Sequence, residues 1–489
     1  MEQHRRVVWI AAACVVLARL LGTLMPIRAD EAGFLLVARS WDPQPDSLYG
    51  HFFVDRPPVL IAVIRGVDLL GQPELLRVLG ALWFGVLVLV AARVGLEIGG
   101  RRAAAWTAVV VAALLVNPVI DVVAIKGEQL GMPFVLLSAL CTLVALRRES
   151  ASLALLAGLC AGIAPGFKQN LVSGLVFAAV VLVGARLAGR LSTKATLRLG
   201  SVGVAGALVP AALTIAWAEL AGVRMETLWY ATFGFRADAS LVLADQGSGP
   251  RTERALLLLA IAVAAGIALV IGVFLAHLRE EWSADRVLTA ATLAVVVVEV
   301  GAVVAGGSYW RDYLHGLVPG TALCVAQLAR RHPAHRPTRV LVLGAVASCV
   351  VSLVVWCVIT AAGLVPYTEA RTGEALAEVA QDGDTLTVFG GRADIQYLAG
   401  LPSPYRHLWS LPMRTLDPDL AGLRGVVNGD DPPTWIVEWV DFDAWNGEAG
   451  EQLRADVEER YVEHGLGCDD RPVYLLRGLE RPELSPSCG

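Results

Sequence analysis

The sequence predicts a polytopic, mainly α-helical membrane bundle followed by a small soluble α/β domain. Of its 489 residues, 56% are hydrophobic and only 17% are charged, and the mean hydropathy is +0.59. A soluble domain is typically near half apolar and about a quarter charged. The hydrophobic residues also gather in blocks of about 20, the length that crosses a bilayer. The net charge is −5, and no basic tract indicates a nucleic-acid partner.

The apolar blocks predict about eleven membrane crossings. The first block follows Arg5 and Arg6 and has no small-residue cleavage site after it, so we expect a retained signal-anchor helix rather than a cleaved signal peptide. The blocks cover residues 7–26, 75–96, 103–119, 131–146, 152–166, 169–186, 199–219, 255–277, 287–306, 314–329 and 339–363.

Every second loop between these blocks is basic, which predicts the orientation. Basic loops stay in the cytoplasm, so the N-terminus is expected inside and, after an odd number of crossings, the C-terminus outside. Abundant Ala, Val, Leu and Arg with little Lys indicate a GC-rich bacterium and thus its cytoplasmic membrane. The basic positions are Arg101, Arg102, Arg147, Arg148, Arg186, Arg190, Lys194, Arg198, Arg279, Arg286 and the run "ARRHPAHRPTR".

Two external loops and a tail complete the organisation. Residues 27–74 form the first loop, in which "PPVLIAVIRGVDLLG" predicts an interfacial amphipathic helix because Arg65 and Asp68 interrupt its apolar run. Residues 221–254 form a second loop with interfacial aromatic side chains. These features place a membrane domain at 1–365 and a soluble domain at 366–489. In the tail, "GDTLTVFGG", "TWIVEWV" and "PVYLLRG" predict strands and "EQLRADVEERYVEHG" a helix.

The eight cysteines fall into two groups. Six lie in apolar blocks and are expected to be inert small hydrophobic residues. Cys468 and Cys488 lie in the tail, where an extracytoplasmic location would permit a disulfide. Their spacing carries no signature, so pairing stays open.

Charged residues gather on the predicted outer face, near bilayer depth. A charge within the bilayer costs on the order of 2.5–3.5 kcal/mol on insertion scales, so such residues usually mark a polar cavity or pathway. They are Asp30 and Glu31 in "RADEAGFLLVARS", Asp55 and Arg56 in "FFVDRPP", Lys126 and Glu128 in "AIKGEQLGMP", Lys168 in "APGFKQN", and Arg311 with Tyr313 in "SYWRDYLHG".

Each of these residues also has a purely structural interpretation. Asp30 suits a helix N-cap, and Lys168 a side chain that reaches back to the interface. The remaining alternatives are a local Asp55–Arg56 ion pair, exposure of Lys126 and Glu128 to lipid headgroups, and an interfacial anchor of Arg311 and Tyr313. His51 and His315 lack metal-ligand spacing.

Taken together, the outer-face charges favour a functional site. Bases in such numbers suit an anionic lipid phosphate. The acids suit deprotonation of a hydroxyl, or a divalent cation bound through oxygen ligands.

The order of these motifs resembles the GT-C membrane glycosyltransferases, especially the bacterial branch of protein O-mannosyltransferases and the lipid A aminoarabinose transferase. The matching pieces are "ADEAGFLLVARS", "FFVDRPPVLIAVIRGVDLLG", "AIKGEQLGMPFVLLSAL", "GIAPGFKQN" and "YWRDYLHGLVP". The resemblance spans the chain to about residue 365, and the tail is similar to the extracytoplasmic domain of many members.

The resemblance implies sugar transfer, with inversion, from a polyprenyl-phosphate donor to a glycan, lipid or protein acceptor. It implies Asp30 as the general base and Glu31 as its partner. It places Arg56, Lys168 and Arg311 at the donor phosphate, and Asp55, Lys126 and Tyr313 remain further candidates. Glu128 stands where relatives usually have Asp, and Phe34 and Leu35 stand where they often have Arg or Tyr, which leaves the substrate open.

Several alternatives remain at this point. A divalent cation, Mg²⁺ or Mn²⁺, is compatible with the acids, but the sequence shows no metal site. A transporter of lipid-linked sugar or small solutes would need midplane charges and paired broken helices, whereas here the charges gather at one face. A non-catalytic role in envelope assembly would leave Asp30 and Glu128 tolerant to substitution. The aromatic residues Trp409, Trp435, Trp439 and Trp445 suit either sugar stacking or core packing.

Overall fold

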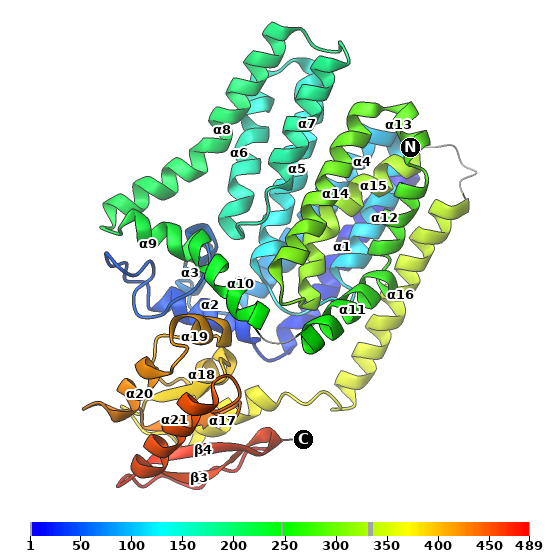
Figure 1. Cartoon of the computed structure of the whole chain (residues 1–489). Coiled ribbons are helices and arrows are strands. Elements are labelled where there is room, and N and C mark those ends of the chain that lie inside the picture. Colours follow the sequence, from blue (N-terminus) through cyan, green and yellow to red (C-terminus); the bar gives the residue numbers. More distant parts are fainter. Residues whose placement is uncertain (1, 246–247, 331–335, 489) are drawn as a thin grey trace.

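The computed structural model describes residues 2–245, 248–330 and 336–488. It shows a bundle of long helices with a small α/β part at one end, and the N-terminus lies at the opposite end of the bundle (Figure 1). The predicted fold class, a mainly helical bundle with a small C-terminal sheet, is confirmed.

Long apolar helices form the bundle. Among the described residues, six are long and apolar enough to cross a membrane, and the bent pair α11–α12 would be a seventh span. Each predicted apolar block falls on a bundle helix, while the total of eleven crossings stays a prediction. The bundle helices are α1 Glu2–Leu20, α4 Leu75–Leu115, α5 Gly127–Arg148, α6 Ala151–Phe167, α7 Ser173–Leu187, α8 Thr193–Leu220, α11 Ser248–Ala264, α12 Ile267–Ala276, α14 Arg286–Gly306, α15 Val318–Arg330 and α16 Arg336–Ala361.

Two glycines with positive φ break these helices. Gly100 (φ 77°) divides α4 into the two predicted blocks. Gly266 (φ 94°) separates α11 from α12, whose axes differ by 74°, so the predicted single block 255–277 is two helices. Glycine adopts this conformation without the steric cost that a Cβ would bring.

Shorter helices lie between the bundle and the C-terminal part (Figure 1). The predicted interfacial helix is α3 Pro58–Asp68, with a proline in its first turn and Leu60, Ile61 and Ile64 buried. The first loop also forms η1 Leu21–Leu24 and α2 Ala29–Arg39. The remaining short elements are α9 Met225–Trp229, η2 Tyr230–Gly234, α10 Phe235–Asp245 and η3 Arg311–Leu317, with α13 Leu278–Ala284 at the other end of the bundle.

The C-terminal part contains one four-stranded sheet in the order β1-β2-β4-β3. β1 pairs with β2 in parallel, and the other two pairings are antiparallel. The strands are β1 Leu386–Phe389, β2 Trp435–Glu438, β3 Tyr461–Gly467 and β4 Arg471–Leu476; the helices are α17 Thr368–Val379, α18 Ala393–Ala399, α19 Ser410–Leu416, α20 Ala421–Asn428, η4 Cys468–Asp470 and α21 Gly447–Arg460.

The three predicted strands are confirmed as β1, β2 and β4. The predicted helix over "EQLRADVEERYVEHG" is wrong at its end, because α21 stops at Arg460 and the next residues form β3. Val462 and Glu463 face Leu475 and Tyr474 in the ladder, so pairing with β4 overrides the helical period. Trp435 is fully buried in the core of the sheet, which favours the packing interpretation for this residue.

The two tail cysteines form a disulfide. Cys468 and Cys488 are bonded to each other, with their Cα atoms 5.4 Å apart. The bond ties the end of the chain to the segment between β3 and β4. The six other cysteines are free, and four of them are buried.

The C-terminal part docks on the segment between α1 and α4. Phe53 N donates a hydrogen bond to the carbonyl oxygen of Arg406 at 3.1 Å, and His51 Nε2 lies 2.8 Å from the carbonyl oxygen of Ser403. The indole of Trp409 packs directly on Gly33 of α2, where a Cβ would lie 2.2 Å from the ring. This contact brings the tail to the helix that carries Asp30.

Candidate active site

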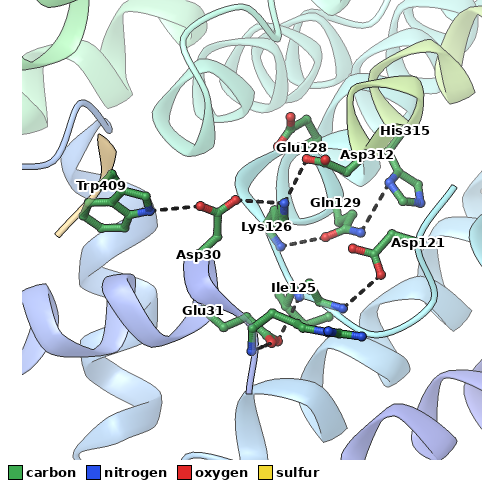
Figure 2. A network of polar contacts seen from close by, with 12 residues as sticks. Asp30, Glu31, Asp121, Ile125, Lys126, Glu128, Gln129, Asp312, His315 and Trp409 are labelled. Carbon is green, nitrogen blue, oxygen red and sulfur yellow. Dashed lines mark hydrogen bonds and ion pairs between the residues drawn. The ribbon is translucent and has the colours of Figure 1, made fainter. Parts of the chain in front are cut away.

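Asp30 lies in the first turn of α2, at the junction of the bundle and the C-terminal part. Its Oδ1 accepts a hydrogen bond from Trp409 Nε1 at 3.0 Å, and its Oδ2 forms an ion pair with Lys126 Nζ at 2.8 Å (Figure 2). The N-cap of α2 is Arg28, so the interpretation of Asp30 as a helix cap is wrong. With 28% of its side chain exposed, the Asp30 carboxylate remains reachable.

Glu31 points to different surroundings, because neighbouring residues on a helix project about 100° apart. Its carboxylate accepts hydrogen bonds from Arg77 at 2.6 and 3.1 Å and from the Ile125 backbone N–H at 2.9 Å (Figure 2). Glu31 is 1% exposed. It therefore ties α2 to α4 and to the segment that precedes α5.

Lys126 lies between two carboxylates. Its ammonium is 2.8 Å from Asp30 and 3.1 Å from Asp312 (Figure 2). Burial lowers the pKa of Lys126, but Asp30, Asp312 and Asp121 outweigh it and hold that pKa well above its usual value. Burial also raises the pKa of Asp30, but Lys126 outweighs it, so the pKa of Asp30 lies below its usual value. Asp30 and Lys126 are therefore both charged at neutral pH.

A second charged group connects the first loop to α10. Asp55 Oδ1 pairs with Arg56 Nη1 at 2.7 Å, and Asp55 Oδ2 pairs with Arg236 Nη2 at 2.5 Å. The predicted local Asp55–Arg56 pair is therefore present. Among the described residues, Arg56 donates hydrogen bonds only from Nη1, to the carboxylate and carbonyl of Asp55. Burial lowers the pKa of Arg56, whereas the carboxylates of Asp55, Asp30 and Glu128 raise it above its usual value.

Glu128 and Lys168 form a third pair, inside the bundle. The Lys168 ammonium contacts the Glu128 carboxylate and lies 4.5 Å from the centre of the Tyr313 ring. Glu128 is 5% and Lys168 8% exposed. Headgroup exposure of Glu128 and snorkelling of Lys168 are therefore wrong, since both residues face the protein interior.

Arg311 differs from the other predicted cations. Its side chain is exposed, and the described part of the chain contains no ion pair for it. The adjacent Asp312 is buried instead and pairs with Lys126. The structure therefore brings Asp30, Asp55, Arg56, Lys126, Glu128, Lys168 and Tyr313 into one region and leaves Arg311 at the surface.

Several residues of this region were not among the predicted ones. Trp409 was assigned to stacking or packing, yet its N–H binds Asp30. Arg236 lies in α10, and Asp312 lies beside the predicted Arg311. Glu299 lies within an apolar run, and a lone acid in such a run is itself a signal of a functional or polar environment.

One cavity is lined by some of these charges, and a second lies nearby without being lined by any of them. The first, which we call the chamber, has a volume of about 220 Å³ and is lined by Glu128, Lys168, Gln169, Asn170, Arg236 and Glu299, with small apolar residues of α14. The second, which we call the groove, measures about 1570 Å³ and lies between residues 42–54, α9 and the C-terminal part. The groove reaches His407, two residues before Trp409.

The residues near Asp30 do not fit a divalent cation. Among the described residues, no three His, Cys, Asp or Glu side chains converge in a metal-binding group. Between Asp30 and Asp312, where two carboxylates face each other, the Lys126 ammonium supplies the positive charge. His315 is buried, and its Nδ1 lies 3.4 Å from the amide nitrogen of Gln129 rather than beside these carboxylates.

Comparison with known proteins yields structural matches only. No family model and no curated protein matches the sequence. The structure of ArnT from Cupriavidus metallidurans bound to undecaprenyl phosphate matches with a TM-score of 0.62 and 15% identity over 97% of this chain and 99% of that one.

A second match is the archaeal oligosaccharyltransferase AglB from Archaeoglobus fulgidus, in complex with an inhibitory peptide and a dolichol-phosphate. Its TM-score is 0.57 at 11% identity, over 98% of this chain and 75% of that one. Another structure of that oligosaccharyltransferase, in complex with Zn and sulfate, matches with a TM-score of 0.50 at 12% identity, over 96% of this chain and 73% of that one. The chain therefore has the fold of the GT-C membrane glycosyltransferases.

Proposed function

We propose that the chain is a membrane glycosyltransferase that transfers a sugar from a polyprenyl-phosphate donor to an acceptor hydroxyl. One observation carries this proposal: the carboxylate of Asp30 is partly exposed and lies in a region rich in cations. Separate segments of the chain bring these cations there, namely Lys126, Arg56, Lys168 and Arg236. The undecaprenyl phosphate in ArnT and the dolichol-phosphate in AglB support a donor of this kind.

Arg56 is the cation we assign first to the donor phosphate. Only its Nη1 is engaged by a described residue, so Nη2 and Nε are available for a two-pronged contact with phosphate oxygens. Lys168 and Arg236 add positive charge nearby, although Glu128 and Asp55 pair with them in this state. Stabilising the charge that develops on the leaving phosphate lowers the barrier to transfer. Arg311 stays a prediction from family resemblance, for phosphate or headgroups at the surface.

Asp30 is the residue we assign to the acceptor. The acceptor oxygen attacks the anomeric carbon from the face opposite the phosphate, which inverts that carbon. The carbon–oxygen bond to phosphate breaks, its electron pair stays on the phosphate, and the acceptor proton passes to Asp30. Because its pKa is low, Asp30 is a weak base that accepts the proton late, when the acceptor oxygen has become acidic.

Lys126 and Glu31 are positioning residues in this proposal. Lys126 fixes one oxygen of Asp30 and supplies the charge that a divalent cation would otherwise supply, so no step requires a metal. Glu31 is fully engaged with Arg77 and Ile125 and orients α2 rather than touching substrate.

The acceptor reaches Asp30 through the groove in this proposal. The groove is lined by residues of the segment between α1 and α4, of α9 and of the tail, and its lining includes His407, two residues before Trp409. The basic alternate loops and the tail disulfide both support an outward-facing groove. Glycan, lipid and protein acceptors all remain candidates.

The test uses purified full-length protein in nanodiscs with undecaprenyl phosphate sugars. We expect wild type to release or transfer one of these sugars, and Asp30→Asn to lose at least about a hundredfold of that activity, the typical contribution of a positioned acid–base group. Arg56→Ala is expected to weaken donor binding. Asp68→Asn, which removes a carboxylate that pairs with Arg39 away from Asp30, serves as the matched control and is expected to remain active.

Two outcomes would contradict the proposal. Folded Asp30→Asn with wild-type activity would remove Asp30 from the chemistry. Transport of intact lipid-linked sugar across a liposome bilayer, without hydrolysis or transfer, would favour the transporter instead.

A further inference from the structure

A further cavity, which we call the far cavity, lies at the end of the bundle away from the C-terminal part, near α13 (Figure 1). It measures about 410 Å³ and lies where the first half of α4, α5, α7 and α15 end and α14 begins. Its charged lining residues are Glu97, Arg147, Glu149, Arg190, Asp285 and Arg330. All other residues of its described lining are apolar. The far cavity therefore combines charged and apolar groups, as an amphiphilic ligand requires.

The length of α5 places the far cavity at the depth of lipid headgroups. This helix begins at Gly127, next to Glu128, and its 22 residues span about 33 Å. That length is close to the roughly 30 Å of the hydrocarbon core of a bilayer. If α5 crosses the membrane, Glu128 lies near one headgroup layer and Arg147 near the other. The far cavity is then at the level of phospholipid headgroups, whichever way the chain is oriented.

Two cations of the far cavity carry N–H groups that no described residue engages. A guanidinium has five N–H bonds. Arg330 uses only Nη2, which lies 3.2 Å from Glu281 Oε2. Arg147 uses Nη1 and Nη2, both on Glu97, which leaves its Nε. The side chains of Arg330 and Arg147 are 25% and 55% exposed, so both are accessible to an anion such as a phosphate.

Glu149 is the acid of the far cavity whose carboxylate is least engaged. Its side chain is 56% exposed, and its one described ion pair, with Arg198, is 3.9 Å long. Glu97 pairs with two arginines, and Asp285 binds Arg190 through both oxygens while it caps α14. Glu149 also follows the last turn of α5, where the helix dipole adds negative charge. A ligand cation is therefore favoured at Glu149.

The balance of charge in the far cavity selects the kind of headgroup. Basic pockets between membrane helices bind purely anionic headgroups. Here three arginines and three acids share the described lining, which suits a headgroup that has both a phosphate and a cation. Quaternary ammonium groups are typically recognised by aromatic faces, and the described lining contains no aromatic residue. A primary ammonium instead donates hydrogen bonds that the Glu149 carboxylate can accept.

We propose that the far cavity binds a phospholipid of the ethanolamine type, which has a phosphate diester and a primary ammonium. Arg330 and Arg147 bind the phosphate oxygens, and Glu149 binds the ammonium. The apolar residues of the lining contact the glycerol end of the lipid. The far cavity and Asp30 lie at opposite ends of the bundle, so this proposal does not depend on the proposed transferase.

The test is native mass spectrometry of the full-length protein in detergent, titrated with one lipid at a time. The lipids are dioleoyl phosphatidylethanolamine, phosphatidylcholine and phosphatidylglycerol. We expect wild type to bind the first about tenfold more tightly than the other two, because they lack the N–H groups of the ammonium that bind Glu149. Soluble glycerophosphoethanolamine is expected to bind more weakly than the lipid, since it lacks the apolar contacts. Equal affinity for the two would overturn the lipid as the ligand.

Two variants and a control test the assigned residues. Glu149→Gln keeps the length of an exposed side chain and removes its charge, so the preference for the ethanolamine lipid over the choline lipid is expected to disappear. Arg147→Gln is expected to weaken the binding of all three lipids by about tenfold. Arg93→Gln is the matched control, because Arg93 pairs with the same Glu97 but does not line the far cavity. Its lipid affinities are expected to equal those of wild type.

Three results would overturn the proposal. Equal affinities of wild type for the ethanolamine and choline lipids, or an unchanged preference in folded Glu149→Gln, would remove the ammonium site. Tighter binding of phosphatidylglycerol than of phosphatidylethanolamine would contradict the charge balance. Equal losses in Arg147→Gln and Arg93→Gln would show that general surface charge, and not the far cavity, attracts the lipid.

Discussion

Asp30 and Glu31 are neighbours in the chain, yet their carboxylates have different surroundings. Asp30 keeps part of its side chain exposed and has an ammonium and an indole N–H as partners. Glu31 is buried against Arg77 and a backbone N–H. The acid pair in the sequence therefore combines a proposed reactive group with a structural one.

Removing the charge of Glu31 is expected to act on stability. Glu31→Gln leaves the Arg77 guanidinium buried without its counter-ion, and breaking a buried pair from one side typically costs about 3–5 kcal/mol. Thermal unfolding in detergent measures the loss. Protein that remains folded is expected to retain transfer, whereas loss of transfer at unchanged stability would move Glu31 into the chemistry.

The low pKa of Asp30 sets a prediction for the pH dependence of transfer. Because Lys126 outweighs burial, Asp30 stays ionised as pH falls, and activity that depends on it is lost only when pH passes below the usual aspartate value of about 4. Lys126→Met removes the opposing charge, so the acidic limb of kcat/KM is expected to move to higher pH. An acidic limb at the same pH in both proteins would contradict this assignment.

At the scale of elements, helix α2 must approach the segment that precedes α19 very closely. Gly33 makes this approach possible, since a Cβ there would meet the Trp409 ring at 2.2 Å. The same indole donates to Asp30, so the close approach and the position of the proposed base depend on one contact.

Gly33→Ala is therefore expected to displace Trp409 and reduce transfer. Small misplacements of reactive groups can cost on the order of a hundredfold in rate. Gly66→Ala is the matched control on α3, because no atom lies within 4 Å of its added Cβ. Equal transfer rates in the two variants would show that the Trp409 contact does not position Asp30.

His407 makes the C-terminal part sensitive to acid. Burial, followed by the charge of Arg406, lowers the pKa of His407 to about 4 from an ordinary value of 6.5. The unfolded chain therefore binds a proton at higher pH than the folded chain. Above about pH 6.5 this histidine leaves the free energy of unfolding unchanged. As pH drops from there to about 4, the free energy of unfolding decreases by on the order of 3 kcal/mol. Urea unfolding followed by tryptophan fluorescence tests this, and His407→Gln is expected to flatten the profile.

At the scale of the whole molecule, the sequence predicted the elements better than their contacts. Apolar blocks located the bundle helices, and alternation with turn residues located β1, β2 and β4. The break at Gly266 was missed because α11 and α12 are continuous in hydropathy. The Asp30–Trp409 bond joins residues 379 positions apart, and no local pattern encodes such a partner.

The site was predicted in the same uneven way. Charges that stand out against apolar surroundings, such as Lys168 and Glu128, lie at the region where the chamber begins. Arg236 lay among the charges of a predicted external loop, where nothing in the sequence distinguished it from solvated residues. Burial and ion pairing distinguish a site residue from a solvated surface charge. Both depend on contacts between distant segments, which the sequence does not show.

The disulfide predicts how the tail responds to reduction. A bond that closes a loop of about 20 residues contributes about 3 kcal/mol in the chain-entropy account. Dithiothreitol is expected to lower the free energy of unfolding of wild type by about this amount. A Cys468→Ser, Cys488→Ser double variant is already at the lower value, so dithiothreitol is expected to leave it unchanged.

The Trp409 indole on Asp30 also restricts how the chain can be recombined. A chimera that joined this bundle to a tail from another protein would lose the hydrogen bond from Trp409 to Asp30, the proposed base, even if both halves folded. A chimera designed to change the acceptor preference would therefore have to keep residues Ser403 to Ser410 of this chain. Only the tail residues before and after this stretch could come from the other protein. That stretch is encoded in the tail, yet it would have to be inherited together with the bundle.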